Sequence, residues 1–594
     1  MRSDESAHSV MQHYRPDIDG LRAIAVLAVI AFHMGYLPNG YLGVDVFFVI
    51  SGYLITRLIH AEMVRGHFTL MGFYLRRMRR IVPLTLAVSG TALLVGVYGM
   101  LPDDLENLAQ SVVATNLFSN NILQAITTRN YWDVVNEFKP MMHTWSLGVE
   151  EHFYFLYPLL LLGLAAGRGS YLRLGLLVAG VVSLSLNWLP VEDFQKFYWM
   201  PFRFYELAIG GVVAVMQTRP LSLGFLRTAL LTGLVTLLAY RPAWLPANLG
   251  QPLTVALSAG LMLDVRHSAS IADRLLRSRL AVAIGLISFS LYMWHQPVLA
   301  FTRYYFTSTL TPSLVLAVIC LILMLSVLSY VAVEKPFRNK QRVRTRTLLI
   351  VVAVAYTLVL LPSFFIHLRS GVVRDVPELD IKTSAVVGNL HAKFNRSAFE
   401  YDKPFAKSDQ IKVLVIGNSF ARDWVNVLLA SEHAVRLDVS YVENPFEHVE
   451  LPARMAQADR IYYSMARVED VARLGLPTGK LKVVGTKSFG VSNGRFYNHS
   501  KERYCEQRTD LEPGSASAND LARMAWGKQY LDLIDRLKDA GGMVPVFTPS
   551  CRFISQDTRH LTRAGAQYFA QLFDDEIRSL LPRQSQADRE EPWR

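Results

Sequence analysis

Long apolar runs constrain this chain more than any other feature. Nearly all of them lie within residues 18–367, whereas residues 368–594 have the composition of a water-soluble domain. A helix that crosses a bilayer needs about 17 to 25 mostly apolar residues. Runs near this length lie at 20–36, 43–60, 81–101, 144–166, 172–190, 201–217, 223–240, 247–264, 281–300, 312–333 and 347–367. The sequence predicts a polytopic α-helical membrane domain of about ten helices, followed by one additional membrane helix over 347–367.

The overall composition agrees with a membrane protein. Hydrophobic residues make up 51% of the 594 residues and charged residues only 19%, whereas soluble domains average about 25% charged. The net charge of +12 comes from basic residues clustered between apolar runs, so we expect no nucleic-acid partner. The three cysteines lack metal-ligand spacing, and no metal is expected. Cys505 and Cys551 could form a disulfide or remain two free thiols.

The connecting segments predict the orientation of the helices. Residues 57–80 and 335–346 are rich in arginine and lysine, and acids outnumber basic residues in the long connector 102–142. Basic connectors favour the cytoplasmic side. We therefore expect a cytoplasmic N-terminus in a bacterial inner membrane, without a cleavable signal peptide. The helix at 347–367 would carry a linker (368–408) and a domain (409–594) to the periplasm.

Several apolar runs contain ionisable groups that anchoring does not require. Arg22 and His33 are eleven residues apart, close to three helical turns, so they share one face over about 16 Å. They could simply lie at opposite interfaces, but Asp45 inside the next run favours a reaction chamber or a permeation path. Further candidates for such a membrane site are Arg76, Arg77, Arg80, Glu150, Arg203, Glu206 and His295.

Two of these groups have a plain structural interpretation as well as a functional one. The arginines at 76, 77 and 80 fit positive-inside anchoring, yet they could also bind the phosphates of an anionic ligand. Arg203 and Glu206 are three residues apart on one helical face, which favours an ion pair within the bundle rather than a catalytic role.

Six motifs, in order, closely resemble those of the membrane-bound acyltransferase-3 family. They are DGLRAIAVLAVIAFH, GVDVFFVISGYLIT, RRMRRIVP, HTWSLGVEEHFYFLYP, SLYMWHQPV and EKPFR, within residues 14–340. The resemblance implies transfer of an acyl group, usually acetyl, from cytoplasmic acyl-CoA to a carbohydrate. Arg22 and His33 match the family's signature pair, so the resemblance makes His33 the general base. The arginines at 76, 77 and 80 would bind the donor, acetyl-CoA, and no permanently bound cofactor is expected.

The C-terminal part has the pattern of an α/β domain. KVLVIGNSFARDW (412–424) predicts a buried strand, a tight turn and a helix start, which exposes Ser419 to backbone N–H groups. QDTRHLTRAGA (556–566) places Asp557 three residues before His560. These three residues would complete a hydrolase-type triad, and alternating strands and helices predict a parallel sheet covered on both sides.

GNS and DTRH resemble blocks of the SGNH hydrolase fold, in the form often fused behind acyltransferase-3 domains. The resemblance implies that Ser419 is the nucleophile, His560 the base and Asp557 its orienting group. Asn418 replaces the aspartate usual in the first block. Gly485 and Asn493 are candidates for the remaining oxyanion donors, although Ser488 occupies the position where the asparagine would be sought first.

These observations together predict an O-acyltransferase with two sites. The membrane domain would accept the acyl group from acyl-CoA, and the SGNH-like domain would pass it to a hydroxyl of an O-antigen, an exopolysaccharide or another surface glycan. Alternatively, the membrane domain acylates the acceptor directly and the outer domain trims or binds glycan. A multi-span transporter or flippase with an accessory outer domain is the competing class, but no internal repeat of the helices supports it.

Overall fold

A computed structural model describes residues 14–127, 136–165, 169–216, 224–240, 245–263, 270–307, 309–385, 388–406, 409–464, 467–497 and 504–581. The ends of several predicted runs (166, 217, 223 and 264) and part of the connector 102–142 lie outside these residues. The chain forms two compact units. The first comprises residues 1–96 and 107–364, and the second comprises residues 97–106 and 365–594.

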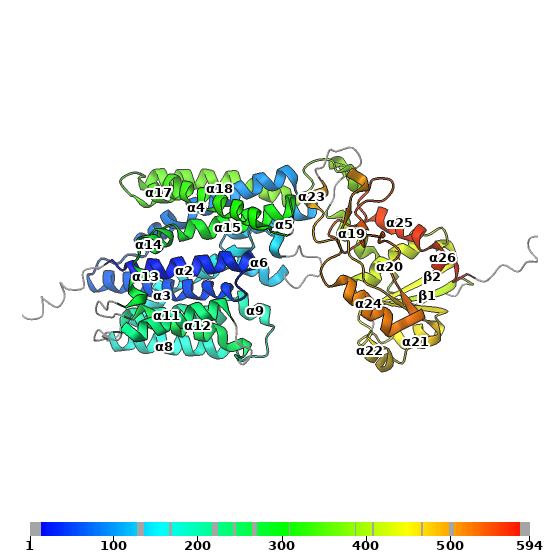
Figure 1. Ribbon diagram of the computed structural model, residues 1–594, viewed down its shortest axis with the longest axis horizontal. Helices are drawn as coiled ribbons and strands as arrows, with labels where there is room; N and C mark the ends of the chain where they lie inside the picture. The colour runs from blue at the N-terminus through cyan, green and yellow to red at the C-terminus, as the bar shows by residue number, and fades with distance from the viewer. Residues whose placement is uncertain are drawn as a thin grey trace, which may run out of the picture. The chain divides into compact units, whose positions relative to one another are not determined.

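The first unit is helical, and each of the eleven predicted apolar runs coincides with a helix. In Figure 1 its long helices lie roughly parallel to one another. The helices that correspond to the runs are α2 (Pro16–His33), α3 (Gly43–Val64), α4 (Leu70–Gly99), α7 (Trp145–Ala165), α8 (Gly169–Leu186), α10 (Met200–Val215), α11 (Gly224–Ala239), α12 (Gly250–Met262), α14 (Arg279–Leu286) with α15 (Ser288–Tyr305), α16 (Pro312–Ser329) and α18 (Thr345–Leu368).

Fewer of these helices meet the requirements of a membrane span than the runs predicted. By length and composition, four helices among the described residues suffice: Gly40–Val64, Leu70–Gly99, Pro312–Arg338 and Thr345–Leu368. The pair α14 and α15, bent by 66°, gives up to a fifth. The protein is thus a multi-pass membrane protein with four to five candidate spans. The other runs form helices that are shorter, such as the 13-residue α12, or that carry several charges, such as α2.

The remaining elements of the first unit are short. The polar connector that follows α4, which the sequence presented only as a loop, contains two helices: α5 (Pro102–Asn116), whose residues 102–106 belong to the second unit, and α6 (Asn120–Thr127). These two helices are amphipathic, with apolar residues along one face only, so a search for continuous apolar runs misses them. The other short helices are α9 (Asp193–Tyr198), α13 (Ile271–Leu276) and α17 (Lys335–Arg338), the last continuing from a π-helical turn at Tyr330–Glu334.

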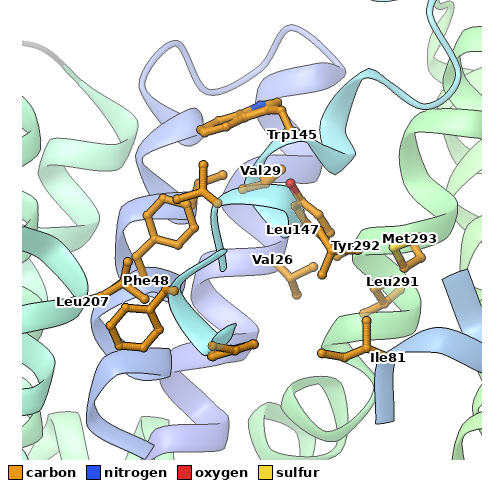
Figure 2. Close-up of a cluster of buried hydrophobic side chains, with 14 of the residues drawn as sticks. Val26, Val29, Phe48, Ile81, Trp145, Leu147, Leu207, Leu291, Tyr292 and Met293 are labelled. Carbon is orange, nitrogen blue, oxygen red and sulfur yellow. The ribbon is translucent and has the colours of Figure 1, made fainter. Parts of the chain in front are cut away.

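One buried cluster joins the helices that carry the candidate membrane site. Figure 2 shows its centre, with side chains from α2, α3, α4, α7, α10 and α15 in mutual contact. Helices α3 and α10 approach closely, because a Cβ on Gly52 would lie 1.9 Å from the Leu207 carbonyl oxygen. Small residues permit such backbone contact between membrane helices. The tight packing fixes the polar groups of α3 and α10 relative to each other.

The second unit is an α/β domain with a five-stranded parallel sheet in the order β2-β1-β3-β4-β6, as the sequence predicted. Alternate strand residues face two separate cores, one against α20, α25 and α26 and the other against α21 and α22, and Figure 1 shows these helices on opposite sides of the strands. The sheet strands are β1 (Ile411–Ile416), β2 (Leu437–Val442), β3 (Arg460–Ser464), β4 (Leu481–Val484) and β6 (Tyr530–Leu531), and β5 (Arg508–Thr509) pairs with β7 (Val544–Pro545).

The helices of this unit are short, and one of them precedes the sheet. They are α19 (Leu390–Arg396), α20 (Ser419–Ala430), α21 (Leu451–Gln457), α22 (Val468–Leu474), α23 (Gly494–Tyr497), α24 (Ser515–Trp526), α25 (Arg563–Leu572) and α26 (Asp574–Arg578). The segment expected as a polar linker, 368–408, belongs to this unit. Its helix α19 packs against α20.

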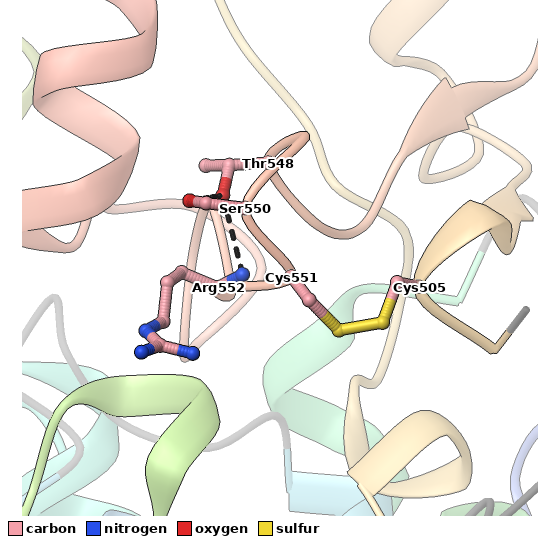
Figure 3. Close-up of a disulfide and its surroundings, with 5 residues drawn as sticks. All are labelled: Cys505, Thr548, Ser550, Cys551 and Arg552. Carbon is pink, nitrogen blue, oxygen red and sulfur yellow. Dashed lines mark hydrogen bonds between the residues drawn. A yellow bond between two sulfur atoms is a disulfide. The ribbon is translucent and has the colours of Figure 1, made fainter.

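A disulfide joins two loops of the second unit. Cys505 and Cys551 are bonded, with their Cα atoms 5.2 Å apart (Figure 3). The Cys551 turn is also held by Thr548 Oγ1, which accepts from the Arg552 N–H at 3.2 Å. The sequence did not decide between a disulfide and two free thiols, and the structure contains the disulfide.

Candidate functional site

Three of the predicted arginines line one cavity in the first unit. Arg22 on α2 and Arg77 and Arg80 on α4 all line it. The space between the lining atoms is about 890 Å³. The remaining walls are mostly apolar, apart from a few polar groups that include Ser51, Ser146, Glu150 and Tyr292. Guanidinium groups at the edge of an apolar cavity suit a ligand with phosphates and a less polar arm.

The arginines of α4 differ in their partners. Arg76 forms an ion pair with Glu62 at 2.7 Å and does not line this cavity. The Arg77 guanidinium lies over the Tyr154 ring, 5.6 Å from its centroid. Arg79, which the sequence did not single out, donates to the Val343 carbonyl oxygen at 2.7 Å. Of the three arginines expected to bind the donor, Arg77 and Arg80 line this cavity and Arg76 does not.

Asp45 belongs to a buried ion cluster rather than to the cavity. Its Oδ1 lies 3.1 Å from Arg203 Nη2, and Arg203 Nε lies 3.0 Å from Glu206 Oε1. The guanidinium also lies over the Trp145 ring. Two carboxylates thus share one cation between α3 and α10. Losing Arg203 would leave both carboxylates without a cation in the bundle, which supports the structural interpretation of Arg203 and Glu206.

His33 lies in a cluster of three histidines. Its ring centroid is 5.2 Å from that of His295, and the His295 centroid is 5.1 Å from that of His143. His295 Nδ1 lies 2.6 Å from the Tyr292 carbonyl oxygen. Both His143 and His295 are buried. His143 opens the HTWSLGVEE motif, but sequence reasoning passed over it because it precedes the apolar run.

Tyr292 connects the cavity to the histidine cluster. It lines the cavity, and its ring packs 5.2 Å from that of His143 and 5.3 Å from that of His295. Its hydroxyl is 2.6 Å from Ser146 Oγ and donates to the His143 carbonyl oxygen at 2.7 Å. Arg22 therefore lines the cavity, His33 belongs to the histidine cluster, and Tyr292 contacts both.

A second site lies at the carboxyl end of β1, where parallel sheets place ligands. Gly417 turns the chain with a φ of +121°, and a Cβ there would lie 3.0 Å from the Ser464 carbonyl oxygen. Asn418 then caps α20 by accepting from the Phe420 N–H at 3.0 Å. Asparagine serves well at a helix N-cap, so this substitution for the usual aspartate preserves the turn. Ser419 is the first residue of α20.

The predicted triad is assembled. Ser419 Oγ lies 3.0 Å from His560 Nε2, and His560 Nδ1 lies 2.5 Å from Asp557 Oδ2. The other oxygen of Asp557 accepts from the N–H groups of Arg559 and His560, at 3.0 and 2.7 Å. Burial favours the neutral acid, but the charge of His560 and hydrogen bonding with His391 and His560 hold the pKa of Asp557 well below its usual range. The carboxylate therefore stays ionised and can orient His560.

A buried ion pair that the sequence did not suggest braces this site. Lys487 Nζ lies 2.7 Å from Asp423 Oδ2 and 3.6 Å from the centroid of the Phe420 ring. The same Asp423 oxygen accepts from the Leu561 N–H at 3.2 Å. The pair thus ties the loop after β4 and helix α20 to the residue that follows His560. A single lysine in a loop gives no sequence signal for such a role.

The expected oxyanion donors are engaged elsewhere. The Gly485 N–H donates to the Leu531 carbonyl oxygen at 3.0 Å, and Asn493 Nδ2 donates to the Ser555 carbonyl oxygen at 2.6 Å. Ser488 Oγ accepts from the Glu512 N–H. This arrangement therefore does not present Gly485 or Asn493 as the predicted donors, because both complete contacts within the domain. At the start of α20, the N–H groups of Phe420, Ala421 and Arg422 donate to Asn418.

Comparisons with known proteins assign a family to residues 15–334. A family model described as an acyltransferase domain, Acyl_transf_3, matches residues 15–334. A putative O-acetyltransferase of Staphylococcus aureus strain MSSA476 is 30% identical over 354 residues, which are 55% of this chain and 58% of the relative. The O-acetyltransferase OatA of S. aureus strain NCTC 8325 is 28% identical over 353 residues, with the same coverage. The chain thus matches less than two thirds of these relatives' length. No solved structure matches it.

Proposed function

The chain belongs to the acyltransferase-3 family, and from that premise we propose that it is an O-acyltransferase, most simply an O-acetyltransferase, that works at two sites. The membrane unit takes an acyl group from acyl-CoA. The α/β unit, which we propose to be SGNH-like, passes the group to a carbohydrate hydroxyl. The observation that carries the proposal is the convergence of Arg22, Arg77 and Arg80 on one cavity of the family-matched region.

The donor end of this route is the arginine-lined cavity. Acyl-CoA combines several phosphates with a flexible, less charged arm that ends in the thioester. Guanidinium groups bind phosphates through paired hydrogen bonds, and the apolar walls suit the arm. In this proposal Arg22, Arg77 and Arg80 hold the phosphates and the thioester extends toward Tyr292 and the histidine cluster. His33 then acts as the general base on the hydroxyl that receives the acyl group, as the family's signature pair implies.

The acceptor end of this route is the triad. Ser419 Oγ attacks the carbonyl carbon of the delivered acyl ester while His560 Nε2 takes the serine proton. The tetrahedral intermediate collapses, the leaving oxygen receives that proton from His560, and an acyl-serine remains. A glycan hydroxyl next attacks the acyl-serine, its proton passes to His560, and the departing Ser419 oxygen takes it back. The products are a glycan ester and the free serine.

The proposed placement follows from the basic connectors and the disulfide. Arginine-rich segments favour the cytoplasmic side of a bacterial inner membrane, where acyl-CoA is made. The disulfide between Cys505 and Cys551 favours an oxidising compartment for the second unit, which we propose is the periplasm. The acceptor would then be a glycan exposed there, such as an O-antigen, an exopolysaccharide or another surface polysaccharide.

The function is tested by ester-linked acetate on purified surface glycans. A deletion strain is complemented with the wild-type gene, with His33→Ala or with Ser419→Ala, and expression of each protein is verified. We expect the wild type to restore the acetate and both variants to fail. Failure of His33→Ala alone would assign the whole transfer to the membrane unit. Unchanged acetate in the deletion strain would contradict glycan acylation and favour transport.

A further inference from the structure

A second histidine lies against the triad, although it precedes the first strand of the sheet. His391 is on α19, and its Nε2 lies 3.8 Å from Asp557 Oδ2. His560 Nδ1 contacts this same oxygen at 2.5 Å. The distance to His391 is that of an ion pair rather than a hydrogen bond. Asp557 is therefore placed between two imidazole rings, only one of which belongs to the triad.

The position of His391 is fixed by its helix. Asn389 caps α19 by accepting from the Ala392 N–H at 2.7 Å. The Arg563 guanidinium lies over the Phe394 ring, 5.9 Å from its centroid, and α19 packs against α20. Helices α20 and α25, which begin at Ser419 and shortly after His560, thus both contact α19. The His391 side chain itself is buried, with 6% of its surface exposed.

The charges around His391 favour its protonated form. Burial alone would lower the pKa of His391, but its close approach to Asp557 and the charges of Asp103 and Asp423 raise it above its ordinary value. Asp103 is itself held by Asn389 Nδ2 at 3.0 Å. The cavity beside His391 also contains two carboxylates and two cations on its walls: Glu378, Asp380, Lys393 and Arg563.

We propose that His391 is a positioning residue of the triad, holding the Asp557 carboxylate toward His560 as an imidazolium. This inference rests on the proposed role of the triad in acyl transfer. A positive charge on His391, beside the same Asp557 oxygen, opposes a second positive charge on His560. His391 would therefore keep His560 neutral, and able to accept the Ser419 proton, to lower pH than Asp557 alone allows.

The pH dependence of ester cleavage tests this role. Cleavage of p-nitrophenyl acetate is measured with full-length protein in detergent, and the rate of Ser419→Ala is subtracted at each pH. In His391→Gln we expect the acid limb of kcat/KM to move upward by about one pH unit, the size of a single nearby charge effect. His391→Lys, which keeps a cation, should restore part of the shift. The control is His433→Gln, since His433 pairs with Asp574 at 3.0 Å outside the triad. An acid limb of His391→Gln that superimposes on the wild type would overturn the proposal.

A readout independent of catalysis separates this inference from the proposed function. Hydrogen exchange at the imidazole C2 position, followed by mass spectrometry, gives the titration midpoint of each histidine. We expect the midpoint of His391 to fall in Asp557→Asn and that of His433 to remain where it was. An unchanged His391 midpoint would overturn the pairing. If wild-type cleavage equals that of Ser419→Ala, the triad's role in transfer fails, while this titration still decides whether His391 and Asp557 are coupled.

Discussion

Arg22 and His33 lie on the same helix but belong to different surroundings. Arg22 lines the cavity with Arg77 and Arg80, whereas the His33 ring packs 5.2 Å from His295. Tyr292 contacts both surroundings. In the proposed function, this separation gives Arg22 and His33 two distinct tasks, donor binding at one end of α2 and proton transfer at the other.

Substitutions of the α4 arginines should differ in their effect on KM for acyl-CoA. Replacing Arg77 or Arg80 with alanine should raise KM for acyl-CoA about tenfold or more, because a hydrogen bond to a charged group contributes about 1.5–3 kcal/mol. Arg76→Ala is the matched control, since Arg76 pairs with Glu62 at 2.7 Å away from the cavity. The measurement is acyl transfer by reconstituted protein at varied acyl-CoA concentration. Equal effects of all three substitutions would contradict a specific phosphate site.

The histidine cluster should be required as a group. His33→Ala should abolish acyl transfer, and His143→Ala should lower kcat about 100-fold if its ring relays or orients the proton. KM for acyl-CoA should change little in either variant, since neither ring lines the cavity. The control is His60→Ala, a histidine of α3 that is exposed. Full activity in His143→Ala would limit the chemistry to His33.

The outer site should lose activity in acid through a histidine and not through Asp557. The pKa of Asp557 is held well below its usual range. The stability that this carboxylate contributes is thus complete above its unfolded pKa of about 3.9 and is lost only as the pH falls through the lower folded value. We therefore expect the acid limb of p-nitrophenyl acetate cleavage to lie above the pH range in which Asp557 becomes protonated. Asp557→Asn should lower kcat by about 10⁴. An acid limb near pH 4 would contradict this assignment.

The disulfide should stabilise the second unit. Cys505→Ser should lower the free energy of unfolding by about 2–5 kcal/mol, the usual cost of removing a native disulfide. Thermal unfolding followed by proteolysis of the second unit measures the effect. Cys320→Ser, at the exposed free cysteine of α16, should leave the transition unchanged. If dithiothreitol does not lower the transition of the wild type, the bond contributes nothing to stability.

The features that the sequence predicted correctly are those that depend on local residue patterns. Each apolar run forms a helix because its composition alone decides that outcome, and GNS followed by DTRH located Ser419, Asp557 and His560 through a turn and a spacing. It did not predict α5 and α6, whose apolar faces are narrow. It also missed His391 and Lys487, because each acts through a partner that is distant in sequence and adjacent only after folding.

The oxyanion donors also could not be predicted from the sequence alone. The resemblance to the SGNH hydrolase fold selected Gly485 and Asn493 by their positions in the sequence. Whether a donor group can bind an oxyanion depends on its hydrogen bonds in the folded domain. Gly485 completes the contact with Leu531 beside β6, and Asn493 binds Ser555. Hydrogen bonds also occupy the start of α20, where Phe420, Ala421 and Arg422 donate to Asn418.

The central claim is that acyl groups pass from the membrane unit through Ser419, and trapping the intermediate tests it most directly. Full-length protein in proteoliposomes is supplied with radiolabelled acetyl-CoA and no glycan acceptor, and peptides containing Ser419 are analysed by mass spectrometry. The account predicts label on Ser419 in the wild type and none in Ser419→Ala or His33→Ala. Label that persists in His33→Ala, or glycan acetylation by a wild type that never labels Ser419, would contradict the relay.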